Sequence, residues 1–207
     1  GEQQEQAESM EFLIFAMFIA VALILLIMVT QFNSFIRPLI IIATVVFSTI
    51  GVFLGLGIFQ MEFVIIMTGI GIISLAGIVV NNGIVLIDYI DLIRARKRKE
   101  LGLSERAFLP KDMQIDALVE AGRTRLRPVI LTAVTTVLGL LPLAIGLNFN
   151  FFTLYTSFDP QITIGGESVA FWGPMSWTVI FGLTFATFLT LLLSPVMYIL
   201  TIKINFG

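Results

Sequence analysis

The sequence contains neither cysteine nor histidine among its 207 residues. Without cysteine there is no disulfide framework, no thiolate nucleophile and no zinc–thiolate site. Without histidine, the commonest proton carrier and metal ligand is missing. No serine–histidine or cysteine–histidine pair can be assembled for nucleophilic catalysis. We therefore expect no metal site, no cofactor and no enzyme activity.

Charged residues are also scarce, at 13% of the chain, where a soluble domain carries about 25%. Hydrophobic residues make up 57%, and the mean hydropathy is +1.01. A glycine-rich phosphate loop followed by lysine and serine or threonine is absent, so ATP hydrolysis is not encoded here. Any energy for work must come from an ion gradient or from another part of the protein.

Apolar runs near or above 18 residues recur along the chain, and such runs indicate transmembrane helices. The predicted fold class is an all-α integral membrane bundle of five transmembrane helices, plus one short cytoplasmic interfacial helix near 110–122. Residues 1–11 are polar and acidic and lack the basic start of a secretory signal, so we interpret them as the tail of a preceding domain. The expected spans are 12–30, 38–59, 63–90, 127–147 and 174–202, with aqueous loops at 91–126 and 148–173.

Lysine and arginine are confined to three places: Arg37, the stretch from Arg94 to Arg127, and Lys203. With five spans, these three places fall on one side of the membrane. The other side has Glu62, Asp159 and Glu167 but no basic residue. Under the positive-inside rule the basic side is cytoplasmic, which puts the N-terminus outside and the C-terminus inside.

Polar residues recur at helical spacing within two of the spans. At about 100° per residue, Ser74, Gly77, Asn81 and Asp88 fall on one stripe of the third span. In the fourth span, Arg125, Thr132, Thr136 and Gly139 do the same. Because polar groups facing lipid are costly, we expect the two stripes to turn toward each other or toward a common cavity.

Two interpretations of these stripes stay open. They could line part of an ion or proton relay, or they could join packed helices through hydrogen bonds, worth only about 0.6 kcal/mol each on average. The paired mid-span amides Asn81 and Asn82 favour the relay, whereas Thr132 and Thr136, taken by themselves, favour helix packing. Asp88 fits either a relay or the cytoplasmic interface, and Arg125 could extend its charge to the membrane edge.

Two further patterns concern packing and surface charge. Gly51 and Gly55 have the small-residue spacing that lets helices approach closely, and Gly77 leaves space beside Asn81. The basic cluster at 94–99 indicates topology and contact with anionic membrane lipid. It has no interleaved aromatic residues, so nucleic acid is not an expected partner.

Several motifs in order carry a resemblance to a known family. They are Gln31-Phe-Asn-Ser-Phe-Ile-Arg-Pro38, Gly77-Ile-Val-Val-Asn-Asn-Gly-Ile-Val-Leu-Ile-Asp-Tyr89, the segment from Glu120 to Thr132, and Leu138-Gly-Leu-Leu-Pro-Leu143. Nearly the whole chain resembles helices eight to twelve of resistance-nodulation-division (RND) transporters of the hydrophobe/amphiphile efflux branch. The resemblance implies the C-terminal membrane part of a twelve-helix pump in the bacterial inner membrane.

The resemblance also implies partners and site residues. Such pumps are homotrimers that join a periplasmic adaptor and an outer-membrane channel, and proton flow drives export of drugs or other amphiphiles. Arg125 and Thr132 match the family's relay arginine and threonine, and Asn82 matches an asparagine of the same motif. Asn81 departs from the pattern, because relatives have a lysine there that pairs with aspartates on helix four of the N-terminal half. An amide cannot titrate or supply a positive charge.

Alternative functions within the same superfamily are a protein-export accessory or a lipid transporter. A third alternative is a structural scaffold, since five helices alone lack the acidic helix four. The segments Arg125-Leu-Arg-Pro128 and Asn81-Asn82-Gly83 favour the efflux branch.

Overall fold

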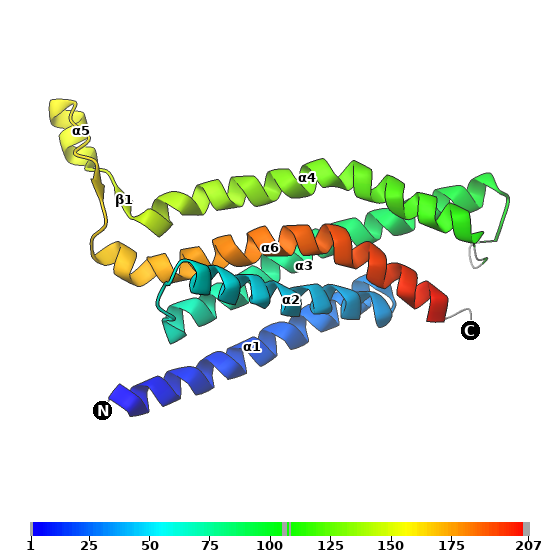
Figure 1. The fold of residues 1–207 in the computed structure, drawn as a ribbon, viewed down its shortest axis with the longest axis horizontal. Coiled ribbons are helices and arrows are strands. Elements are labelled where there is room, and N and C mark those ends of the chain that lie inside the picture. The colour runs from blue at the N-terminus through cyan, green and yellow to red at the C-terminus, as the bar shows by residue number, and fades with distance from the viewer. Residues whose placement is uncertain (1, 105–106, 108, 205–207) are drawn as a thin grey trace.

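Five long helices and one short hairpin, made of two strands and a small helix, make up the chain (Figure 1). The computed structural model describes residues 2–104, 107 and 109–204. The five long helices are each long and apolar enough to cross a membrane, as predicted, so the all-α membrane-bundle fold is confirmed. The elements are α1 (Glu2–Phe32), α2 (Ile36–Ile58), α3 (Ile65–Glu100), α4 (Lys111–Ile145), β1 (Leu147–Asn148), α5 (Phe151–Ser157), β2 (Thr163–Ile164) and α6 (Glu167–Ile204).

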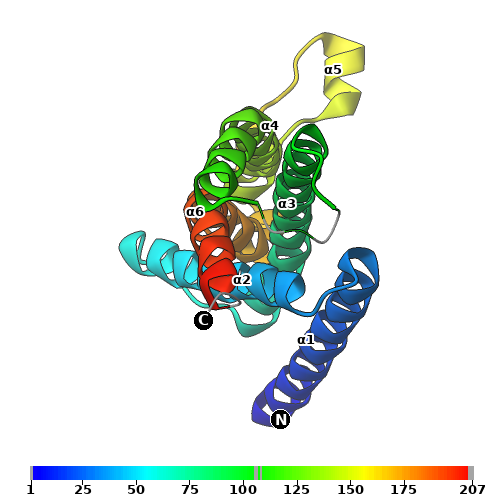
Figure 2. The same cartoon turned by 90° about the vertical axis from the view of Figure 1, so that its right-hand side faces the viewer.

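Helix α6 lies in the middle of the bundle, where it packs against α2, α3 and α4 (Figures 1 and 2). Helix α1 contacts α2 and α3 and diverges from the bundle toward its N-terminus (Figure 1). Only 6% of the most apolar window of α1 is buried, against 50% for α3. The bundle therefore has a packed centre around α6 and long apolar faces left for lipid or for other helices.

The helices extend further than the hydropathy pattern predicts. Helix α1 begins at Glu2, so most of the predicted tail 1–11 is helical, and α3 continues from the membrane span to Glu100. The helix expected near 110–122 is present, but as the first turns of α4 and not as a separate element. Its side chains Ala117, Leu118 and Ala121 are buried in the same hydrophobic cluster as Ile90 and Ile93 of α3. This packing explains why one continuous helix forms across the predicted boundary.

The second loop is also more ordered than expected. Strands β1 and β2 pair antiparallel, and α5 lies between them. Helix α6 begins at Glu167, before Pro174, which is inside the helix. The indole Nε1–H of Trp177 donates to the carbonyl oxygen of Ala144 at 3.1 Å, and this bond satisfies a carbonyl in the last turn of α4. Trp177 thereby joins the ends of α4 and α6.

Close packing of α2 on α6 depends on two glycines of α2. A Cβ atom at Gly51 would overlap the side chain of Phe185, and one at Gly55 would overlap the ring of Phe181. At Gly57, two residues further along and on the other side of the helix, a Cβ atom would meet no other atom within 4 Å among the described residues. The absent side chains at positions 51 and 55 therefore make room for the phenylalanine rings of α6.

We predict that Gly55→Ala destabilises the protein by about 1–3 kcal/mol, because the added methyl group displaces the Phe181 ring from a filled contact. Gly57→Ala is the matched control: it adds the same methyl group to the same helix in open space, and the helix-propensity gain of up to about 1 kcal/mol is unopposed. Thermal unfolding of the purified protein in detergent measures both. Equal unfolding temperatures for the two variants would contradict the packing described here.

Candidate functional site

The polar stripe of α3 lies on a face that the described helices leave uncovered. Ser74, Gly77, Asn81 and Asp88 are all exposed. A Cβ atom at Gly77 would meet nothing within 4 Å among the described residues. The packing role expected for Gly77 thus has no neighbour in this part of the protein and stays a prediction.

The two adjacent amides point in different directions. Asn81 is exposed, whereas Asn82 is buried, with 8% of its surface accessible. The next residue, Gly83, lies against Ile41 of α2, where a Cβ atom would come within 2.9 Å of the isoleucine side chain. Because successive helical residues are rotated by about 100°, one amide faces the bundle and the other faces outward. Of the two amides, only Asn81 therefore lies on the polar stripe of α3.

On α4 the hydroxyl groups are satisfied within their own helix. The Thr132 hydroxyl donates to the Val129 carbonyl at 2.9 Å, and the Thr136 hydroxyl donates to the Thr132 carbonyl at 2.8 Å. Thr132 is exposed, Thr136 is half-buried, and Gly139 has open space beside it within the described chain. Such back-bonding lets a hydroxyl lie at membrane depth while its oxygen can still accept a further hydrogen bond.

Arg125 connects the two helices that carry the stripes. Its guanidinium carbon lies 4.2 Å from the centre of the Tyr89 ring, the residue after Asp88 on α3. This is a cation–π contact between α4 and α3. The Nε–H of Arg125 is buried and has no hydrogen-bond partner among the described residues. The arginine is therefore held by a ring, and its charge is not neutralised by an acid in the described part of the chain.

The stripes were expected to face each other or a common cavity. Within residues 2–104, 107 and 109–204, no hydrogen bond or ion pair joins Asn81 or Asp88 to Arg125 or Thr132. The contact that links a stripe residue to the other helix is that of Arg125 with the Tyr89 ring, next to Asp88. Sequence inspection did not single out Tyr89 as a partner of Arg125, because the contact depends on how α3 and α4 pack and not on spacing within either helix.

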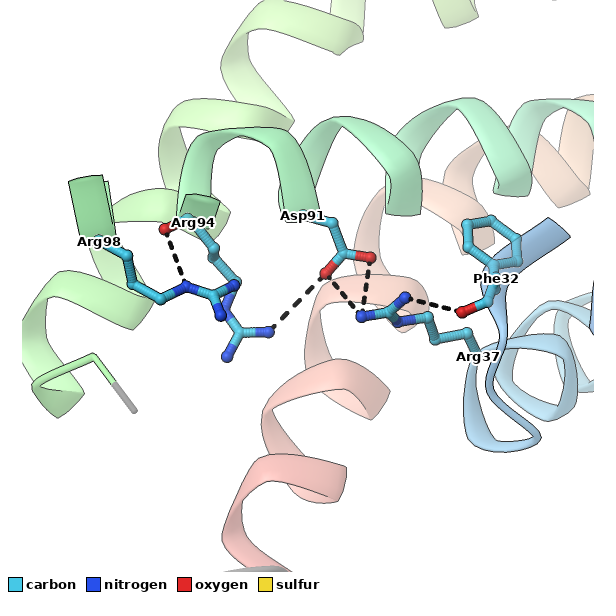
Figure 3. A network of polar contacts seen from close by, with 5 residues as sticks. All are labelled: Phe32, Arg37, Asp91, Arg94 and Arg98. Atoms are coloured by element: carbon cyan, nitrogen blue, oxygen red, sulfur yellow. Dashed lines mark hydrogen bonds and ion pairs between the residues drawn. The ribbon is translucent and has the colours of Figure 1, made fainter. Parts of the chain in front are cut away.

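A charge network lies on the same end of the bundle (Figure 3). Asp91 of α3 forms an ion pair with Arg37 at 3.2 Å and a longer one with Arg94 at 3.8 Å. Arg37 also donates to the carbonyl oxygen of Phe32 at 3.3 Å, which ties the turn between α1 and α2 to α3. A second ion pair, from Lys97 to Glu120 at 3.6 Å, ties α3 to α4. These contacts fix the helix ends next to Tyr89.

The described residues contain no group of three or more histidine, cysteine, aspartate or glutamate side chains that could hold a metal ion. What they present is an exposed amide, an exposed carboxylate, a hydroxyl and a guanidinium on two adjacent helices. These groups can exchange hydrogen bonds and respond to charge. A nucleophile–base pair cannot be built from them.

Comparison with known proteins identifies the family. The sequence model of the AcrB/AcrD/AcrF family matches residues 1–202. The chain is 36% identical over 198 residues to the swarming motility protein SwrC of Bacillus subtilis (strain 168), an alignment that covers 96% of this chain and 16% of SwrC. It is 30% identical over 200 residues to the multidrug resistance protein MdtC of Photorhabdus laumondii, covering 95% of this chain and 16% of that protein.

A second multidrug resistance protein MdtC, from Erwinia tasmaniensis, is 28% identical over 186 residues, which cover 90% of this chain and 15% of that protein. The chain thus spans a small part, 15–16%, of the curated relatives it matches. The family match extends over all five long helices and both polar stripes. On this basis the chain belongs to the AcrB/AcrD/AcrF family of RND transporters.

Proposed function

We propose that this chain is the C-terminal membrane part of a proton-driven exporter of drugs and other amphiphiles. The observation that carries the proposal is the exposure of Asn81 and Asp88 on α3 and of Thr132 on α4, within a largely apolar bundle. Polar groups at membrane depth mark ion and substrate pathways when they face a water-filled path or other helices. Family membership supports transport, and the names of the MdtC relatives support drugs as substrates.

Proton coupling in this proposal uses a permanent charge and a partner acid. In this proposal Arg125 acts as a fixed positive charge. The acid that takes up the proton lies on the preceding half of the protein. When that acid is ionised it is drawn toward Arg125, and when it is protonated the attraction is lost. Thr132 and Asn81 relay hydrogen bonds along the same surface without changing charge.

The same proposal assigns location and partners. The chain lies in the bacterial inner membrane, with its basic helix ends cytoplasmic and its N-terminus periplasmic, as the distribution of lysine and arginine favours. It works together with a preceding half that carries an acidic helix four. The complete transporter is a homotrimer that joins a periplasmic adaptor and an outer-membrane channel.

Arg125→Ala and Thr132→Ala are each expected to lower the rate of export by the full-length transporter about tenfold or more, the effect of losing at least about 1.4 kcal/mol at the limiting step. Thr135→Ala is the matched control. Its hydroxyl is exposed and donates to the Leu131 and Thr132 carbonyls in the same way, but it lies about 60° around the helix from Thr132 and about 80° from Arg125. Dye efflux at equal protein levels is the measurement. Unchanged efflux in both relay variants would remove these two residues from the pathway.

Tyr89→Leu is expected to lower export about two- to thirtyfold, because it removes a ring contact worth about 0.5–2 kcal/mol to the position of Arg125. Tyr89→Phe keeps the ring and should export at nearly the original rate. Comparing the two variants separates the effect of losing the aromatic ring from the effect of losing the hydroxyl group. Equal loss in both variants would show that the hydroxyl, and not the cation–π contact, is what export requires.

Reporter fusions test the orientation. A cytoplasmic reporter fused at Ser104, between α3 and α4, should be active, and the same reporter fused at Asp159, between α4 and α6, should be inactive. A periplasmic reporter should give the opposite pattern. Cytoplasmic activity at Asp159 would overturn the proposed topology.

A further inference from the structure

The segment between α4 and α6 forms a small ordered hairpin, to which the transport proposal assigns no role. Strand β1 pairs with β2 in the register Leu147↔Ile164 and Asn148↔Thr163. Helix α5 lies at the tip. Figure 1 shows α5 projecting past the end of α4, with its axis running across the direction of the long helices, and Figure 2 shows it displaced to one side of the bundle, next to α4. The element lies at the end of the bundle opposite the arginine network, where α4 ends and α6 begins.

Its own polar groups hold this conformation. The Asn148 side chain donates to the carbonyl oxygens of Gly146 at 3.1 Å and Gly165 at 2.8 Å. The Asn150 side chain caps α5 by accepting from the backbone N–H groups of Phe152 and Thr153. At the base, Gly146 has φ 70°, and a Cβ atom there would overlap Val169. The hairpin is therefore shaped by hydrogen bonds and glycine, and its apolar side chains are not needed to close it.

Those apolar side chains are displayed on one side of α5. At 100° per residue, Phe151, Leu154 and Tyr155 fall within one arc with Phe152 at its edge, and the opposite arc holds Thr153, Thr156 and Ser157. Phe158 follows the helix with a left-handed backbone, φ 55°. Tyr155 is 89% exposed and Phe158 is 90% exposed. The described chain leaves most of this apolar face exposed; within it, the Phe151 ring contacts the Phe149 ring, and Leu154 is 39% exposed.

The charge of the hairpin and its position in the chain indicate what covers the apolar face of α5. Residues 147–166 contain one charged residue, Asp159, and no lysine or arginine. The exposed apolar side chains Leu143 and Ile145 lie in the last turn of α4, a helix long and apolar enough to cross a membrane, and this turn leads directly into the hairpin. At the start of α6, Phe171 and Trp172 are exposed and in edge-to-face contact at 4.9 Å. Aromatic residues of this kind gather where lipid headgroups meet the acyl chains.

We propose that α5 and its hairpin lie flat in the headgroup region of the membrane, with the aromatic face inserted toward the acyl chains beside α4. An uncharged amphipathic helix that runs across the spanning helices is suited to this position. Its partner is the lipid surface on the side away from the basic helix ends. The proposal rests on the chain being a multi-pass membrane protein, and its choice of leaflet rests on the orientation proposed above. It does not require that the protein transports protons or drugs.

Spin labels in the full-length transporter test this proposal. The described chain has no native cysteine to interfere, and cysteines elsewhere in the transporter are replaced by serine. Labels are placed at Tyr155→Cys on the aromatic side and at Ser157→Cys on the polar side. The protein is reconstituted in vesicles of phosphatidylethanolamine and phosphatidylglycerol, and collisions with oxygen and with a water-soluble nickel chelate are measured. Oxygen concentrates in the acyl region, and the nickel chelate stays in water.

The ratio of oxygen to nickel accessibility should be several-fold higher at position 155 than at position 157. Equal ratios with high nickel accessibility at both positions would place the hairpin in water and overturn the proposal. Exclusion of both reagents from position 155 would show that protein covers the aromatic face, which also overturns it. None of these outcomes depends on export, so the proposed function and this inference can fail separately.

A second measurement, with tryptophan variants, tests insertion without a spin label that could disturb the hairpin. Tyr155→Trp keeps an aromatic side chain at the most exposed part of α5 and should leave the hairpin folded. The additional fluorescence relative to the unmodified protein should be quenched when brominated lipids replace the ordinary ones. Thr156→Trp, on the polar side, should be quenched much less. Equal quenching at the two positions, or none at position 155, would contradict insertion of the aromatic face.

Discussion

Lipid offers no hydrogen bonds, and this constraint determines where each polar group of the bundle lies. Several threonine hydroxyl groups donate to carbonyls of their own helix: Thr44 donates to the Ile41 carbonyl at 2.6 Å, and Thr187 donates to the Leu183 carbonyl at 2.7 Å. An asparagine amide has two donors and a carbonyl acceptor, and Asn81 has no such local solution on its outward face. Among the described residues, the buried Thr68 hydroxyl and the Nε–H of Arg125 have no hydrogen-bond partner. Asn81 and Arg125 are the two of these polar groups that lie on the stripes of α3 and α4.

The rest of the fold positions these two groups. Helix α6 packs in the centre, with the rings of Phe181 and Phe185 set against Gly55 and Gly51 of α2. Helices α3 and α4 then pack on α6 and meet through Tyr89 and Arg125. At the same end, the ion pair between Arg37 and Asp91 holds the turn between α1 and α2 against α3. The packed interior thus leaves the polar faces of α3 and α4 uncovered within the described chain.

Most of the fold could be predicted from the sequence, because apolar runs of membrane length leave few alternatives to helices. The continuity of α4 through Arg127 and Pro128 could not be predicted, because the charges there suggested a break. In the structure, Ala117 and Ala121 pack in one hydrophobic cluster with residues of α3, and the helix is continuous. The hairpin at 147–164 was also missed: a seven-residue helix held by asparagine side chains has no hydropathy signal. Within the site, spacing identified the stripe of Asn81, but the ring beneath Arg125 comes from packing between helices.

Substrate-dependent proton movement in the variant Asn81→Leu is the most direct test of the central claim, that the outward face of α3 is part of a proton pathway. Leucine has nearly the size of asparagine but forms no hydrogen bonds, and position 81 is exposed in this chain, so packing here is retained. In vesicles that contain the full-length transporter and an internal pH dye, the variant should lose about nine-tenths or more of the proton flux, a barrier increase of at least about 1.4 kcal/mol. Proton flux equal to that of the unmodified transporter would contradict the claim.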